Sequence, residues 1–209
     1  FLATPAWLER YNTSPADALK GVRLSIHETN YEGFIFDPIL REAGLTFEDV
    51  SLTNILPPSS IDAVKNDAVD ILSAIEPWNT RLMDSGLVSY WMGGHEMVPE
   101  TQVGMLLYGP NLLEGDPDVG IRFMKAYLKG VAMFNDGTTE RNLEILGETL
   151  GLDAGLLQRA CWPTINEDGA VNLESIDAYQ EWAVTMELVE QMVPVEDYWD
   201  PSFVEEAGK

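Results

Sequence analysis

The sequence predicts an α/β fold. Apolar runs at residues 22–26, 49–55 and 69–75 alternate with segments of helical spacing, so that two strand–helix units lead into a third strand. Because the connections are short, we expect the three strands to run parallel in one sheet, joined by right-handed crossovers. The third run is apolar almost throughout, which is typical of a strand that is buried on both faces.

The first helix of this pattern has recognisable ends. Its apolar spacing covers residues 36–43, Thr29 or Asn30 can serve as the N-cap, and Gly44 is a suitable stop. Pro38 allows two interpretations. Either the helix begins at this proline, or the proline kinks a helix that begins near Asn30, and the pattern does not decide between them.

The remainder of the chain is expected to be mostly helical. A second helix is predicted over residues 61–68 and a third from Trp78, and two further β-like runs follow at 87–92 and 101–108. Later helices are expected at residues 116–131, 143–150, from 153 and at 172–189.

Composition narrows the possible partners. The 209 residues include 35 acidic and 12 basic side chains, a net charge of −23. Such a balance argues against nucleic acid and anionic membrane surfaces as partners, because binding to them needs patches of Lys and Arg. The single cysteine, Cys161, excludes an internal disulfide, and beside Trp162 it is interpreted as a small packing residue.

The predicted sheet places a ligand crevice beyond the carboxyl ends of its strands. Three connections lie there: the loop after the first strand, the loop 55–60, and the Glu-Pro-Trp sequence that follows the third strand. The side chains of the first and last of these can bind a small polar ligand. The candidate ligand-binding residues are His27, Thr29, Asn30, Tyr31, Glu76 and Trp78.

Each candidate also has a structural interpretation. Glu76 can accept hydrogen bonds from an amine or a polar heterocycle, or it can cap the helix that follows. Trp78 can stack on a flat ligand or pack in the core. The residues from Thr29 to Tyr31 can donate hydrogen bonds to a ligand, or they can only cap a helix.

No metal site, catalytic group or cofactor is predicted. His27 and His95 each neighbour a glutamate, Glu28 and Glu96 respectively, but no recognised ligand spacing joins the two pairs.

Four segments together resemble a known family. Individually weak, they occur in a specific order and spacing: Leu19–Leu24, Arg41–Val50, Ala63–Ile71 and Glu76–Trp78. They are similar to the NMT1/THI5-like group of type II periplasmic binding proteins, the solute receptors of ABC importers for thiamine-pyrimidine precursors, alkylsulfonates, taurine and nitrate. The turn Asn66–Ala68 departs from the pattern, because it lacks the family's usual glycine.

The resemblance implies a particular architecture. It is a periplasmic binding protein type II-like α/β fold with one complete parallel-core α/β lobe and a helical, incomplete second lobe. Residues 1–20 would form an incoming segment, 21–100 lobe two, and 101–209 a crossing strand with the helical part of lobe one. The first half of lobe one would lie upstream of this chain, so we expect apolar stripes such as residues 119–131 to need a cover from a partner or an oligomer.

The resemblance also implies a function. The chain would be a non-catalytic, extracytoplasmic receptor that presents a small ligand to an ABC permease, although no signal peptide or lipid anchor is visible in it. A pyrimidine-like nitrogen heterocycle is the preferred ligand, because Arg and Lys are scarce near the predicted crevice. The alternatives are an enzyme on the same fold, disfavoured because the family's cysteine motifs are absent, and an oligomeric interaction module.

Overall fold

The computed structural model describes residues 1–208 and contains one five-stranded mixed sheet with the order β3-β2-β4-β1-β5. β2 pairs in parallel with β3 and β4, as the two crossover units predict, whereas β1 is antiparallel to both β4 and β5. The predicted α/β class and the parallel core are therefore confirmed. The strands are β1 (Leu2–Ala3), β2 (Arg23–Ser25), β3 (Ser51–Thr53), β4 (Ile71–Leu72) and β5 (Ser89–Tyr90).

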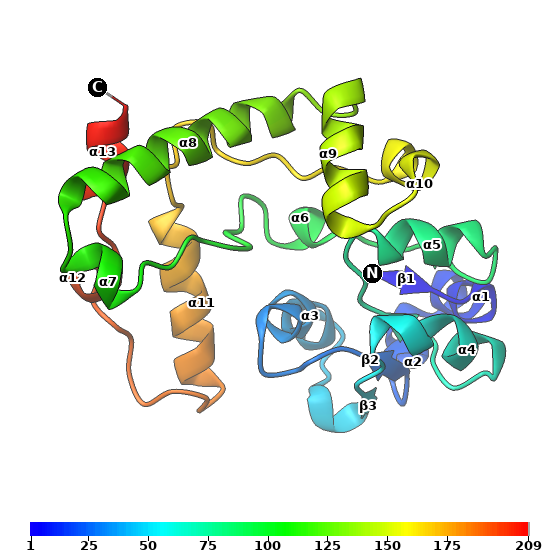
Figure 1. Cartoon of the computed structure of the whole chain (residues 1–209). Helices are drawn as coiled ribbons and strands as arrows, with labels where there is room; N and C mark the ends of the chain where they lie inside the picture. Colours follow the sequence, from blue (N-terminus) through cyan, green and yellow to red (C-terminus); the bar gives the residue numbers. More distant parts are fainter. Residues whose placement is uncertain (209) are drawn as a thin grey trace.

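Helices surround this sheet and then form a second, open part of the molecule (Figure 1). The first group is α1 (Pro5–Thr13), α2 (Pro15–Leu19), α3 (Tyr31–Glu42), α4 (Ser60–Lys65), α5 (Trp78–Asp84) and α6 (Gly94–Met97), with 3-10 turns η1 (Phe47–Asp49) and η2 (Pro57–Ser59). The second group is α7 (Pro110–Leu113), α8 (Pro117–Asn135), α9 (Glu140–Leu150), α10 (Ala154–Arg159), α11 (Leu173–Thr185), α12 (Val195–Tyr198) and α13 (Ser202–Ala207). Within residues 1–208, none of these helices combines the length and the apolar character that crossing a bilayer requires.

Among the described strands, β1 is the one that the sequence pattern did not predict. Leu2 and Ala3 lie between β4 and β5 and are buried, so the start of the chain occupies an inner position of the sheet. A two-residue strand is too short to show the alternation from which strands are recognised.

The main core lies between this sheet and helices α1–α3. Trp7 is fully buried and donates an indole hydrogen bond to the carbonyl of Ala18 over 2.9 Å. Its ring stacks on Tyr11 and meets Trp91 edge to face, with centroids 4.9 and 4.8 Å away. These aromatic contacts join the first helices to the segment after β5.

α3 resolves the ambiguity at Pro38. The helix begins at Tyr31, directly after the N-cap Asn30, and Pro38 lies inside it. The helix therefore begins near Asn30, as in the second interpretation, and continues through Pro38. Gly44 follows the helix with a φ of +71°, a backbone conformation that glycine adopts without strain.

A buried carboxylate joins the amino ends of β2 and β4. Asp70 accepts hydrogen bonds from the backbone N–H of Arg23 at 3.0 Å, from its Nε at 3.0 Å and from a terminal guanidinium nitrogen at 2.8 Å. Burial raises the pKa of Asp70, but the hydrogen bonds and the charge of Arg23, with a smaller contribution from Arg10, hold it below the ordinary value.

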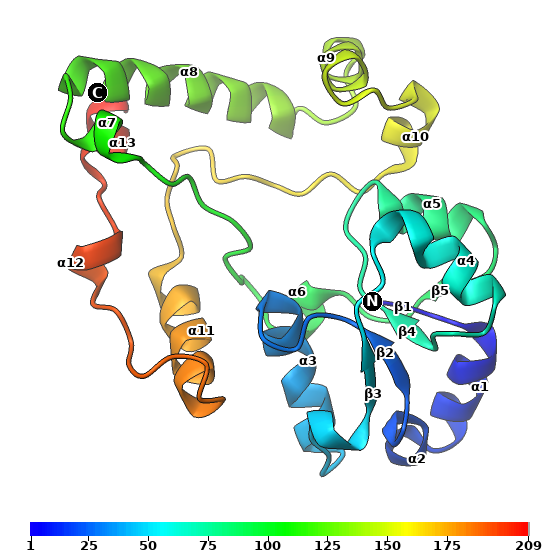
Figure 2. The same ribbon diagram turned by 60° about the horizontal axis from the view of Figure 1, so that its bottom comes forward.

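The second part of the molecule is a helical frame that one extended segment, after α6, links to the α/β part, and a second extended segment joins α10 to α11 within the frame (Figure 2). α11 packs on α3, where the indole of Trp182 donates to Asp37 over 3.2 Å and Phe34 meets Tyr179 edge to face. α13 packs on α8, where the ring of Phe203 lies directly against Gly120.

One sequence expectation fails in this second part, and another applies to fewer residues than predicted. The β-like run 101–108 is extended but forms no strand, because none of the described strands lies alongside it. The apolar stripe of α8 is divided, since Val131 is buried whereas Val119 and Phe123 are 44% and 45% exposed. The part of the stripe that still needs a cover, as expected from sequence, is therefore the part in the first two turns of α8.

Candidate functional site

The carboxyl ends of the three parallel strands lie at one edge of the sheet, as the sequence predicts. Ser25, the last residue of β2, joins them: its hydroxyl accepts from Ile55 N–H at 3.2 Å and its carbonyl accepts from Ser73 N–H at 3.0 Å. In the sheet order, β2 and β4 are neighbours. From β2 the chain continues to β3, on one side of this pair, whereas from β4 it continues to β5, on the other side. Such a switch point is where open α/β sheets place their ligand crevice.

The loop after β2 presents two of its predicted side chains to solvent. His27 and Thr29 are exposed, whereas the side-chain oxygen of Asn30 accepts from Glu32 N–H at 2.8 Å and so caps α3. Tyr31 is half-buried. Burial raises the pKa of its hydroxyl, and a hydrogen bond with Thr101 offsets only part of that rise.

Gly33 fixes the path of this loop. Its N–H donates to the carbonyl of His27 over 3.1 Å, and a Cβ at this position would overlap the carbonyl of Glu28. The loop and the first turn of α3 therefore have to pass each other at a separation that only glycine permits.

Gly33→Ala is accordingly expected to lower the free energy of unfolding by about 1–3 kcal/mol, because backbone has to move to admit the methyl group. Urea unfolding measures it. Gly130→Ala is the matched control: this α8 position has open space around it, and the added alanine is expected to leave stability unchanged or to raise it by up to about 1 kcal/mol. Equal stability of the two variants would contradict the steric account.

The carboxylate of Glu76 accepts hydrogen bonds from two residues, Thr80 and Cys161. One carboxylate oxygen accepts from Thr80 N–H at 3.2 Å, and the other accepts from the Thr80 hydroxyl at 3.0 Å and from Cys161 N–H at 3.1 Å. It thus caps α5, one of the two roles inferred from sequence, and also holds the segment after α10. A carboxylate has about four acceptor positions, so one is left for a ligand.

Trp78 begins α5 and is half-buried. The guanidinium of Arg81 lies 4.8 Å from the centre of its ring, a cation–π arrangement that covers one ring face. Sequence reasoning did not include Arg81, although the spacing of three residues on a helix predicts this neighbour. The guanidinium of Arg81 thus adds a positive charge to the strand-end edge, where the sequence analysis expected few basic side chains.

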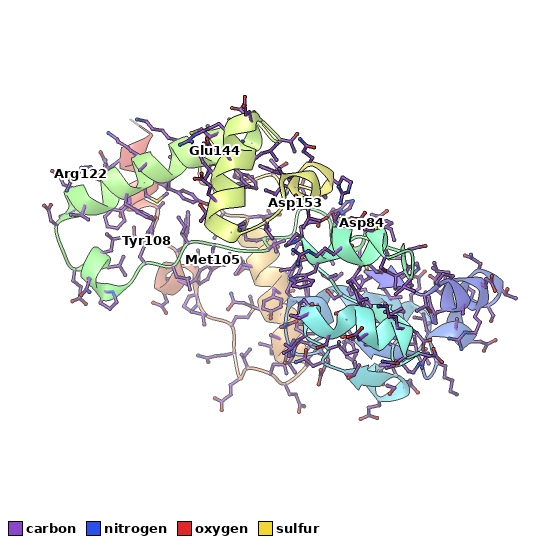
Figure 3. All side chains as sticks on the ribbon, turned by 45° about the vertical axis from the view of Figure 1, so that its right-hand side comes forward. Asp84, Met105, Tyr108, Arg122, Glu144 and Asp153 are labelled. Carbon is purple, nitrogen blue, oxygen red and sulfur yellow. The ribbon has the colours of Figure 1, made fainter. Side chains whose placement is uncertain are left out.

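Further residues near this edge were not among the predicted ligand-binding residues. Arg159 of α10 forms an ion pair with Asp84 of α5 at 2.7 Å, and Figure 3 shows α5 beside α10 at this place. Leu56 and Ile75, which follow β3 and β4, are apolar and largely exposed. Cys161 is exposed, so its interpretation as a packing residue is wrong: its backbone N–H makes the contact with Glu76, and its thiol has no place in the core.

A separate hollow of about 1120 Å³ lies in the helical frame. Residues 100–108 and 163–166 line it together with α8, α12 and the residues around them, and none of the six predicted ligand-binding residues does. This hollow is therefore distinct from the strand-end edge of the α/β part. Among residues 1–208, no cluster of three or more His, Cys, Asp or Glu side chains is arranged to hold a metal ion.

Solved structures share this fold. The chain aligns with the periplasmic aliphatic sulphonate binding protein SsuA from Escherichia coli at a TM-score of 0.69 and 22% identity, covering 96% of this chain and 64% of that one. It aligns with the ligand binding component of an ABC-type import system from Staphylococcus aureus, solved with zinc bound, at 0.76 and 16%, covering 90% and 64%. A desulfurization enzyme, DSZB, aligns at 0.59 and 15%, covering 99% and 74%.

The chain thus has the fold of type II periplasmic binding proteins and spans about two thirds of the length of these neighbours. No protein-family model matches the sequence, and a search of curated proteins found no relative.

Proposed function

We propose that the chain is the ligand-binding part of a solute receptor for an ABC importer. The observation that carries this proposal is the switch point at the ends of β2 and β4, in a fold shared with import-system binding proteins. The receptor binds a small polar ligand without changing it, works outside the cytoplasm and delivers the ligand to a permease. The sequence motifs support its assignment to the NMT1/THI5-like group, and we assign lobe two to residues 21–100 and the helical part of lobe one to 101–209.

A pyrimidine-like nitrogen heterocycle is the first candidate ligand. The remaining acceptor position of Glu76 would take a hydrogen bond from a ring amino group, and the face of the Trp78 ring opposite Arg81 would stack on the ligand ring. His27 and Thr29 are exposed on the neighbouring loop and can bond to the polar edge of the ligand. Asn30 and Tyr31 would position this loop, as the cap of α3 and the first residue of the helix.

An aliphatic sulfonate is the second candidate. Arg81 provides a cation at the same edge, Leu56 and Ile75 offer apolar surface for an alkyl chain, and one of the fold neighbours is named as an aliphatic sulphonate binding protein. The two ligand classes use different residues, so variants separate them.

A thermal-shift screen with pyrimidines and alkanesulfonates, followed by calorimetric titration, tests both candidates. For a heterocycle, Glu76→Gln is expected to weaken binding about tenfold or more, since a hydrogen bond to a charged group contributes about 1.5–3 kcal/mol. For a sulfonate, Arg81→Gln is expected to cause a loss of that size. Arg122→Gln, an exposed arginine of α8, is the control and should bind like the unchanged chain.

Each result leads to a definite conclusion. If no compound of either class binds, or if the control variant weakens binding as much as the site variants do, the proposed site is wrong. Mass spectrometry of the bound compound tests the enzyme alternative, which the fold of DSZB keeps open: conversion of the compound would contradict a pure receptor. Light scattering after size exclusion tests the oligomeric module, for which a clean monomer would be the contrary result.

A further inference from the structure

The loop after β5 begins at the same edge of the sheet as the loops after β2 and β4. Leu72 of β4 is in register with Ser25 of β2 and, on its other side, with Leu2 of β1. Tyr90, the last residue of β5, is in register with Leu2. β5 runs in the same direction as β4, because both are antiparallel to the strand between them. The chain therefore leaves β5, like β2 and β4, at the edge that carries the candidate site.

Tyr90 and the loop that follows it lie between two of the predicted ligand-binding residues. On one side, Cys161, whose N–H bonds to Glu76, is near enough for its charge to raise the pKa of Tyr90. On the other side, a Cβ at Gly94 would lie 3.5 Å from the hydroxyl of Tyr31. Figure 2 shows α6, which follows this loop, beside α3, and the two helices are in contact. The loop after β5 thus joins the two predicted sides of the site.

The hydroxyl proton of Tyr90 is committed to Glu96. The hydroxyl donates to Oε2 of Glu96, and the same oxygen accepts from the backbone N–H of Gly93. These two hydrogen bonds, the one from Tyr90 first, lower the pKa of Glu96. Partial burial, and then the hydrogen bond with Glu96 and its charge, raise the pKa of Tyr90 to about 12. At neutral pH the phenol is therefore protonated with its proton toward Glu96, and its oxygen offers a ligand only lone pairs.

We propose that Tyr90 contacts the ligand as a hydrogen-bond acceptor, that Glu96 positions it for this role, and that the site therefore selects a ligand with N–H donors. This inference rests on the proposed function and chooses between its two candidate ligands. Glu76 is an acceptor as well. An amino group on a pyrimidine-like ring supplies N–H donors to both residues, whereas a sulfonate has only acceptor oxygens and would face the lone pairs of both.

Calorimetric titration with 4-aminopyrimidine, pyrimidine and butanesulfonate tests this selection. The unchanged chain is expected to bind 4-aminopyrimidine about tenfold or more tightly than pyrimidine, which is the same ring without the amino group. Tyr90→Phe is expected to weaken the binding of 4-aminopyrimidine about 3–10-fold, because one hydrogen bond is lost and the ring is kept. Tyr127→Phe is the matched control: it removes the same hydroxyl from α8 and should bind like the unchanged chain.

Glu96→Gln separates positioning from structural support. The amide oxygen can still accept from the N–H of Gly93, but the amide N–H group would donate to the phenol oxygen and turn the proton of Tyr90 toward the ligand. This variant is therefore expected to lose affinity for 4-aminopyrimidine about 3–10-fold and to gain affinity for butanesulfonate by about the same factor. Damage to the loop alone would weaken the binding of both compounds.

The outcomes distinguish this inference from the proposed function. If Glu76→Gln weakens the binding of 4-aminopyrimidine and Tyr90→Phe does not, the inference is wrong and the receptor function stands. A preference of the unchanged chain for butanesulfonate, or a Glu96→Gln variant that binds both compounds more weakly, also overturns it. If none of the three compounds nor any compound of the thermal-shift screen binds, the inference and the proposed function both fail.

Discussion

Replacing Trp7 with Ala is expected to lower the free energy of unfolding by about 4 kcal/mol, within the range for large core aromatics. The side chain is fully buried and makes ring contacts with Tyr11 and Trp91, and its indole N–H bonds to Ala18. Truncation removes these contacts and leaves a cavity where α1, α2 and the segment after β5 meet.

Chemical unfolding followed by circular dichroism measures this loss, and Trp7→Phe keeps the measurement possible if the alanine variant does not fold. The phenylalanine variant keeps most of the ring but loses the hydrogen bond to the buried carbonyl of Ala18, and we expect a loss of about 1–3 kcal/mol. Leu107→Ala is the control, because this side chain is 85% exposed and its truncation should change stability by no more than about 0.5 kcal/mol. A core that tolerated Trp7→Ala as well as Leu107→Ala would contradict the described packing.

Asp70→Asn is expected to cost about 1–3 kcal/mol, because the buried carboxylate loses its charge-assisted hydrogen bonds to Arg23, whose partly exposed guanidinium keeps its ion pair with Asp67. Asp70 is 6% exposed and fixes the backbone and the guanidinium of Arg23 at the amino ends of β2 and β4. The neutral amide preserves the shape, so the loss reports on charge and hydrogen bonding. Asp62→Asn is the control: its ion pair with Lys65, at 3.9 Å, is on the surface, and its loss should stay below about 0.5 kcal/mol.

The same carboxylate predicts a pH dependence. The folded pKa of Asp70 lies below its ordinary value, so folding favours the ionised form. Its contribution to stability is therefore fully present above the unfolded pKa of about 3.9 and is lost as pH falls through the lower folded value. Unfolding measured on both sides of this window should show a smaller pH slope for Asp70→Asn than for the unchanged chain, and equal slopes would contradict the assignment.

The parallel core could be predicted from sequence because its signals are local. The apolar runs at 22–26, 49–55 and 69–75 each contain an observed strand, although the strands are shorter than the runs. Pairing ends where neighbouring strands end, and a sequence pattern does not show this. β1 escaped detection because two residues have no periodicity, and the run 101–108 forms no strand because strand formation requires a partner.

The candidate site could be placed from sequence but not completed. The parallel topology predicted from sequence implies that the loops after β2 and β4 lie side by side. The hydrogen bonds of Ser25 to the residues that follow β3 and β4 agree with this prediction. The contact of Glu76 with Cys161 N–H and the ion pair of Asp84 with Arg159 depend on tertiary folding across 85 and 75 positions of the chain. No local pattern contains that information, and the charge at the edge was underestimated for a different reason, since Arg81 was within reach of helical spacing.

The measurement that tests the central claim most directly is an amide chemical-shift titration of the isotope-labelled chain with the strongest ligand of the thermal-shift screen. A receptor site at the switch point predicts that the largest shifts fall in the loops 26–31 and 73–81, with smaller effects at Cys161 through its bond to Glu76. Shifts confined to residues 103–108 and the hollow in the helical frame, or spread evenly over the surface, would contradict the site and with it the proposed function.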